Sequence, residues 1–293
     1  MTDWQKRLIG LYLLICDEYD THLVWNSQRM SNNQSLAFSD QEVLTVYLFG
    51  LLEGRKRVSE IHRYARNHLT EWFPSLPSYA AFSRRVNALE NCFAVLAENL
   101  LARFSCLSGP AVLMIDSMPI ILAQGVRSSR ARSCSQIAQK GYCSSKGYYY
   151  GVKFHVVTQQ RPGRLPIPRL CCLTGAAAHD LEGLSLMQPM LPQADLYADR
   201  AYCSEPVRTE LREQKSVVFL TPHKKKPKGA ELDYLQQVYN TSISRVRQPI
   251  ESFFNWMVNR FDIQKASTIR SEKGLRRHVF ACIAAAALWF VYP

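Results

Sequence analysis

Apolar residues in the first hundred positions recur with helical spacing. Between residues 4 and 17 they occupy positions 4, 8, 11, 12 and 15, which share one face of a helix. A second apolar set covers residues 43–52. Ser39 and Glu42 precede it, and such a pair can satisfy free backbone N–H groups in a first helical turn. Helices are also predicted at 59–68 and, after two prolines, as one long helix at 78–104. The pattern predicts an all-α N-terminal module over residues 1–108.

The pattern changes after Ser108-Gly109-Pro110, which we interpret as a domain boundary. Short runs rich in apolar, β-branched or aromatic residues predict strands at 111–115, 148–158, 170–173, 195–199 and 216–220. Helices are predicted at 179–187, at 206–214 and from about 231 onward. The polar, serine-rich segment 124–146 is expected to be a loop. Strands followed by alternating helix and strand indicate a mixed α/β domain over residues 109–293.

The excess of basic over acidic residues lies in this second part of the chain. Residues 1–108 hold 11 Lys and Arg against 11 Asp and Glu, whereas residues 109–293 hold 25 against 13. No carboxylate stands between Asp116 and Asp180, an interval that carries nine Lys and Arg. A one-sided basic field attracts polyanions, of which nucleic acid is the commonest and an anionic membrane the rival.

A membrane or exported protein is not expected. The N-terminus lacks the features of a signal peptide, and the longest apolar run, 279–293, is shorter than the roughly 20 residues of a spanning helix. The nine cysteines are scattered without a CxxC pair, which predicts reduced thiols in a cytoplasmic protein rather than disulfides or a zinc site.

Two predicted strands end in a carboxylate, Asp116 and Asp199. Residues just beyond strand ends are exposed at the edge of an α/β sheet, so two such acids on neighbouring strands can share a divalent cation. Glu251 is the best third candidate, because it stands beside the apolar face of a late helix. Arg247, four residues earlier, can orient this carboxylate or hold a phosphate. Taken singly, each acid is equally consistent with a turn, a helix cap or a local ion pair.

Four segments around these acids resemble DDE insertion-sequence transposases, most closely the bacterial "nine-eighty-two" group. They are Leu113-Met-Ile-Asp-Ser-Met-Pro119, Gly147-Tyr-Tyr-Tyr-Gly-Val-Lys-Phe-His155, Tyr197-Ala-Asp-Arg-Ala-Tyr-Cys-Ser204 and Arg247-Gln-Pro-Ile-Glu-Ser-Phe-Phe254. The wider signature of these transposases is Tyr-x2-Arg-x3-Glu-x6-Lys. Arg247 and Glu251 match it, whereas Ser244 and Val258 replace the Tyr and the Lys, so the roles of those two residues are not carried over.

The resemblance implies a ribonuclease-H-like mixed sheet with helices, preceded by the all-α module. It implies that Asp116, Asp199 and Glu251 bind two Mg²⁺ ions, with Mn²⁺ as a possible substitute. The enzyme would cut DNA at transposon ends and join the freed 3′-OH to target DNA. Its partners would be double-stranded DNA, as terminal inverted repeats and target, and further copies of the chain in a dimer or higher assembly. A bacterial, nucleoid-associated location is expected.

Basic residues suggest where DNA would be contacted. Arg127, Arg130 and Arg132 lie in an acid-free segment suited to phosphates, and Lys153 alternates with His155 on a predicted strand. Among Tyr148–Tyr150, at least one residue must face the core, and packing is expected for two of the three. In the helical module, Arg84 and Arg85 follow the start of a helix as in a DNA-recognition helix. Two alternatives stay open: a metal-dependent nuclease of the same fold without strand transfer, and a non-catalytic DNA-binding protein.

Overall fold

The computed structural model describes residues 2–27, 36–103, 111–223 and 232–291. These residues divide into two compact units. The first contains residues 1–102 together with 257–263 and 269–293, and the second contains residues 103–256 and 264–268. The predicted boundary at Ser108-Gly109-Pro110 lies outside the described residues.

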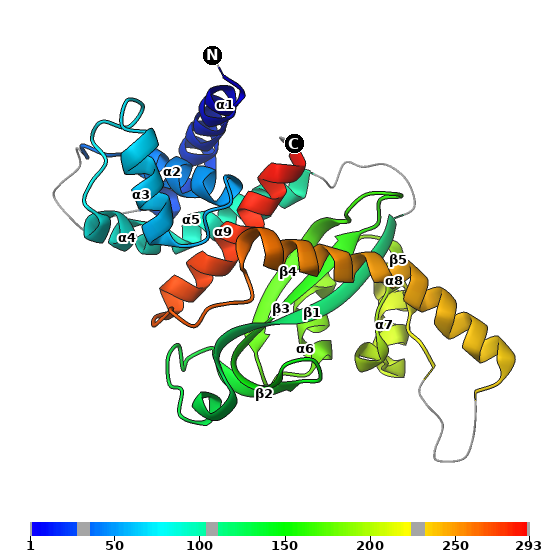
Figure 1. The fold of residues 1–293 in the computed structure, drawn as a ribbon. Helices are drawn as coiled ribbons and strands as arrows, with labels where there is room; N and C mark the ends of the chain where they lie inside the picture. The colour runs from blue at the N-terminus through cyan, green and yellow to red at the C-terminus, as the bar shows by residue number, and fades with distance from the viewer. Residues whose placement is uncertain (1, 28–35, 104–110, 224–231, 292–293) are drawn as a thin grey trace. The chain divides into compact units, whose positions relative to one another are not determined.

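The first unit is helical (Figure 1). It contains α1 (Asp3–Glu18), α2 (Asp40–Leu52), α3 (Val58–His68), α4 (Tyr79–Ala88), α5 (Glu90–Arg103), α9 (Glu272–Val291) and the last turns of α8 (Tyr234–Phe261). Between α1 and α2 lie two short helical segments, η1 (Tyr19–Leu23) and η2 (Val24–Asn26).

Helix α2 is the centre of this unit. Every residue from Val43 to Leu51 is buried, and α2 contacts α1, α3, α4 and α9. A helix that is apolar on all sides is stable only when neighbours cover it completely. Its N-terminus carries the predicted capping box, in which Ser39 Oγ accepts a hydrogen bond from the Glu42 backbone N–H at 3.1 Å.

The prediction of one helix over 78–104 is wrong, because the chain forms α4 and α5 with a break at Leu89. Phe82 and Val86 are buried from α4, Leu89 is buried at the break, and Phe93 and Leu96 are buried from α5. The helical spacing of these buried residues continues through the break, so it gave no sign of one.

The second unit is a six-stranded mixed sheet with helices (Figure 1). Its strands are β1 (Ala111–Gln124), β2 (Gln139–Cys143), β3 (Gly147–Gln159), β4 (Ile167–Gly175), β5 (Ala194–Tyr197) and β6 (Val218–Leu220). The order is β2-β3-β1-β5-β6, and β4 continues beside β3 where β2 ends. Strand β3 is antiparallel to its neighbours β1 and β4, whereas β5 and β6 run parallel to β1. The predicted α/β class with a preceding helical region is confirmed.

Helices lie on both faces of this sheet (Figure 1). Helices α6 (Asp180–Met187) and α7 (Glu205–Lys215) pack on one face, where Leu184 and Leu211 share a core with Leu113 and Ile115 of β1. Residues of β1 alternate between faces, so Asp116 is directed away from this core and toward α8. After α8, residue Ala266 returns to β1 by donating its backbone N–H to Ile121 O at 2.9 Å.

The segment 124–146, expected to be a loop, contains the short helix η4 (Gly125–Ser129) and strand β2. Strand β2 exists because Gln139–Cys143 pairs with Gly147–Gly151 of β3 in a hairpin. Its residues are mostly exposed, so the sequence has no alternation of apolar and polar residues that would predict this strand. Cys16, Cys92, Cys143, Cys172, Cys203 and Cys282 form no disulfide with a described residue.

Candidate active site

Asp116 lies within β1 rather than at its end, so the prediction that the strand stops there is wrong. Strand β1 continues because antiparallel pairing with β3 extends to Gln124. Its parallel pairing with β5 does stop nearby, at Met114 opposite Tyr197. Asp116 is two residues beyond Met114, and Asp199 is two residues beyond Tyr197. The register therefore brings both acids to the same edge of the sheet.

Asp199 follows β5 as the N-cap of η6 (Arg200–Tyr202), and its Oδ1 accepts a hydrogen bond from the Ala201 N–H at 2.7 Å. The capping contact engages one carboxylate oxygen of Asp199. It also fixes the direction of the carboxylate at the edge of the sheet.

Arg247 connects the first and third candidate acids. Its Nη1 donates to Asp116 Oδ2 at 2.6 Å, and its Nη2 donates to Glu251 Oε1 at 3.1 Å. Arg247 and Glu251 are four residues apart on α8 and therefore share a face of the helix. The Arg247 and Asp116 side chains are 17% and 19% exposed, whereas that of Glu251 is 57% exposed. One guanidinium thus joins a carboxylate of the sheet to a carboxylate of the helix.

Burial raises the pKa of Asp116 to about 6. The Arg247 cation and the Ser117 backbone N–H lower this pKa, while the carboxylates of Asp199 and Asp180 raise it further. Desolvation of the charged carboxylate is thus the largest effect on the pKa of Asp116, and the two neighbouring carboxylates add to it.

Asp180 is a fourth acid beside the site. Its Oδ1 accepts hydrogen bonds from Ser117 Oγ at 2.9 Å and from Lys153 Nζ at 3.2 Å. Lys153 also donates to the carbonyl oxygen of Ala178 at 2.7 Å, and its side chain is 17% exposed. Asp180 does not cap α6, because His179 is the N-cap and its Nδ1 accepts a hydrogen bond from the Leu181 N–H. Asp180 instead links α6 to the residue that follows Asp116.

His155 lies behind this region as a core residue. It is completely buried, its Nε2 shares a 2.8 Å hydrogen bond with Thr174 Oγ1, and burial lowers its pKa to about 4. A neutral, buried and hydrogen-bonded histidine of this kind has a structural role.

The carboxylates are hard oxygen donors of the kind that Mg²⁺ prefers. Among the residues that the structure describes, no group of three or more His, Cys, Asp and Glu side chains is placed to hold a metal ion. Arg247 contributes positive charge between Asp116 and Glu251 instead. By donor chemistry the acids fit a divalent cation.

A basic surface surrounds the hairpin of β2 and β3. Arg127, Arg130 and Arg132 are all exposed, and none of them forms an ion pair with a described residue. A hollow of about 460 Å³ lies next to them, with Lys140, Lys146 and Tyr148 in its wall. Two of the three consecutive tyrosines, Tyr149 and Tyr150, are buried as expected, whereas Tyr148 is 61% exposed.

Exposed Tyr142 of β2 was not singled out from the sequence. Its ring contacts that of Tyr148 with centroids 5.2 Å apart, and Lys140 Nζ lies 5.1 Å from the Tyr148 ring centroid. Only the hairpin register, which pairs Tyr142 with Tyr148, reveals this aromatic pair.

The two arginines predicted to read DNA from α4 are placed very differently. Arg84 is exposed. Arg85 donates to the carbonyl oxygen of Phe38 and, at 2.8 Å, to Asp40 Oδ1, and its side chain is 18% exposed. Within the helical unit Arg85 is therefore part of a largely buried ion pair.

A family model described as "Transposase DDE domain" matches residues 108–271. The match covers more than half of the chain, so the protein belongs to this family of DDE transposases. The predictions of a DDE transposase and of a ribonuclease-H-like fold are confirmed, and DNA is the partner that the family implies. Membership of the "nine-eighty-two" group stays a prediction. A comparison with curated proteins finds no match. None of the helices in the described ranges combines the length and apolar character needed to span a membrane.

Proposed function

We propose that this protein cuts DNA at transposon ends and transfers the freed 3′-OH to target DNA, with Asp116, Asp199 and Glu251 as its catalytic carboxylates. The observation that carries the proposal is the Arg247 guanidinium, which contacts both Asp116 and Glu251. It brings an acid of the sheet next to an acid of a helix far along the chain. The β1–β5 register adds Asp199 at the same edge.

The three carboxylates would hold divalent metal, Mg²⁺ or Mn²⁺, as a pair of ions. Metal bound there supplies positive charge that favours deprotonation of the attacking oxygen and stabilises the leaving oxygen in an in-line displacement. Asp116 and Asp199 bind from the edge of the sheet, and Glu251 binds from α8. The raised pKa of Asp116 means that metal competes with a proton for this carboxylate, so binding is expected to weaken below about pH 6.

Arg247 holds the acids in place before metal and DNA bind. Its two contacts reduce the repulsion among the carboxylates and fix α8 against β1. A guanidinium also binds phosphate in a bidentate manner, so Arg247 can exchange a carboxylate for a DNA phosphate when metal takes over the neutralising role. Lys153 and Asp180 position Ser117, the neighbour of Asp116.

The remaining basic residues bind the DNA that enters the site. Arg127, Arg130 and Arg132 contact phosphates near the β2–β3 hairpin, where their unpaired charges release counterions from DNA. The helical unit binds the transposon ends, and two or more copies of the chain act on paired ends. Such a protein works in the bacterial cytoplasm, on the nucleoid.

A cleavage assay tests this proposal. Purified full-length protein is incubated with supercoiled plasmid carrying the DNA that flanks its gene, with Mg²⁺ or with EDTA. We expect nicks or breaks at the repeat ends in Mg²⁺, none in EDTA, and none with Asp199→Ala. Asp195→Ala is the matched control, because Asp195 is an exposed acid on β5, the strand that precedes Asp199, and its loss changes the charge equally. Cleavage by Asp195→Ala should equal that of the wild type.

The other outcomes identify the alternatives. Metal-dependent nicking without joined products would make the protein a nuclease of the same fold. Retardation of the DNA without cutting under any divalent metal would refute catalysis and leave a DNA-binding protein. Cleavage that survives Asp199→Ala would refute the assignment of the carboxylates while leaving the activity.

A further inference from the structure

Helix α3 presents a polar face that the packing of the helical unit leaves uncovered. Its inner face is buried through Ile61, His62 and Ala65. Its outer face carries Arg63 and Asn67, both exposed and one helical turn apart. Neither side chain makes a hydrogen bond or an ion pair with any residue in the described ranges. This face thus offers donors and charge that the fold does not use.

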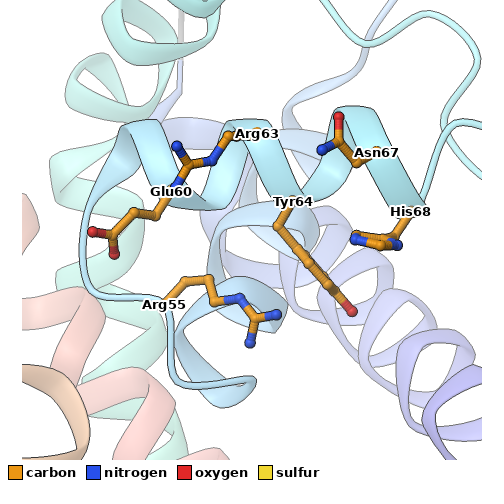
Figure 2. Close-up of a pocket in the computed structure, with 6 residues that line it drawn as sticks. All are labelled: Arg55, Glu60, Arg63, Tyr64, Asn67 and His68. Carbon is orange, nitrogen blue, oxygen red and sulfur yellow. The ribbon is translucent and has the colours of Figure 1, made fainter.

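A pocket of about 310 Å³ lies on this face (Figure 2). Tyr64 extends from the middle of α3, and the guanidinium of Arg55 lies over its ring, 4.4 Å from the centroid. His68 contacts the same ring with centroids 5.1 Å apart. These aromatic contacts restrict the long Arg55 side chain before any ligand arrives, which lowers the entropy lost on binding. The pocket is lined by Arg55, Glu60, Arg63, Tyr64, Asn67 and His68.

The only acid in this lining is already engaged. The Glu60 carboxylate accepts from the backbone N–H groups of Lys56 and Arg57 at 3.2 and 3.3 Å, and it lies 3.8 Å from Arg57 Nε. These contacts close the first turn of α3. The net charge available to a ligand in the pocket is therefore positive, which suits an anion.

Helix α4, where the sequence analysis predicted DNA recognition, has far fewer polar side chains available to bind DNA. Arg85 is bound to Phe38 and Asp40, and Asn87 Oδ1 accepts from Arg277 Nε at 3.2 Å. Arg84 is the remaining exposed arginine of that helix. The polar groups of α4 mostly hold the helical unit together, whereas those of α3 point outward.

We propose that the outer face of α3 binds double-stranded DNA, with Arg55 on a phosphate and with Arg63 and Asn67 toward base edges. This inference rests on the proposed function, in which the helical unit holds the transposon ends. The buried α2, a turn over 53–57 and the exposed α3 follow the order of a helix-turn-helix motif, whose second helix enters the major groove. Arg and Asn are side chains that recognise guanine and adenine edges there.

Fluorescence anisotropy of the full chain tests the inference with two duplexes: DNA from the ends flanking its gene, and a scrambled duplex of equal length. The variants are Arg63→Ala, Asn67→Ala and Arg55→Ala. Lys6→Ala is the matched control, because Lys6 is exposed on α1 and its loss removes the same charge outside the pocket. All four side chains are outside the buried core, and circular dichroism checks that each variant is folded.

We expect Arg63→Ala and Asn67→Ala to weaken binding to the end duplex roughly 5- to 100-fold and the scrambled duplex much less. Arg55→Ala should weaken binding to both duplexes alike. It should also lower the salt dependence of the binding constant by the equivalent of about one phosphate contact. Lys6→Ala should bind both duplexes nearly as the wild type does.

Wild-type affinity in the three pocket variants would overturn the inference. Arg84→Ala is measured beside them, and a loss of affinity confined to that variant would return recognition to α4. Cleavage measured on the same wild-type sample separates the two proposals. Pocket variants that bind and cut normally refute only the role of α3. A wild type that binds the end duplex but never cuts refutes only the catalytic proposal.

Discussion

Replacing Arg85 by Met should destabilise the helical unit rather than act first on DNA. The change removes the cation beside Asp40, whose side chain is 5% exposed, and also the donor to the Phe38 carbonyl. Removing one partner of a buried ion pair costs about 3–5 kcal/mol, because the remaining charge stays buried. Since Arg85 is partly exposed, the lower end of this range applies. At roughly 2–4 °C per kcal/mol, we expect Tm to fall by about 10 °C.

Thermal melts followed by circular dichroism measure this effect, with Arg84→Met as the control. Arg84 is the exposed neighbour on the same helix, and its replacement should change stability by no more than about 0.5 kcal/mol. A second variant, Asp40→Asn with Arg85→Met, neutralises the stranded charge and should recover much of the loss. If Arg85→Met melts like the wild type but loses affinity for DNA, the structural role assigned to Arg85 is refuted.

Two further predictions concern buried histidines. Gly183→Ala should lower the free energy of unfolding by about 1–3 kcal/mol, because a Cβ atom there would lie 2.4 Å from the ring of His155. Gly10→Ala is the control, since a Cβ atom at that position would have nothing within 4 Å and should not destabilise the protein in this way. Urea unfolding compares the two variants. Burial holds the pKa of His278 at about 4, below its usual 6.5, so the unfolded state binds a proton first as pH falls. His278 should therefore contribute a loss of about 2 kcal/mol of stability between pH 7 and pH 5, measured as the difference between the wild type and His278→Gln, because His155 and Asp116 keep their own contributions in both proteins. An identical pH dependence of the urea midpoint in the two proteins would contradict this prediction.

Local signals in the sequence were sufficient for most elements. The periodicity of α1, the capping residues of α2 and the β-branched run of β3 each depend on neighbouring residues alone. The same is true of the three acids, whose identities and flanking residues stand out without the fold.

What the sequence could not reveal depends on long-range packing. The break at Leu89 leaves no mark in the apolar spacing, which continues from α4 into α5. The alanine-rich α9, with residues 281–287 all buried, gives no hint that its partners include α2. Arg85 and Arg63 are both helical arginines, and only packing shows that the first is bound to Asp40 while the second is exposed.

The long separation between Asp116 and Arg247 affects how the protein is made. These residues are 131 positions apart, and α8 follows every strand of the sheet. At the usual rate of synthesis on the ribosome, the interval between them takes on the order of 10 s. During that time a growing chain carries the acids of the sheet without Glu251. Under the proposed function, a chain released before Glu251 is synthesised is therefore expected not to cut the DNA around it.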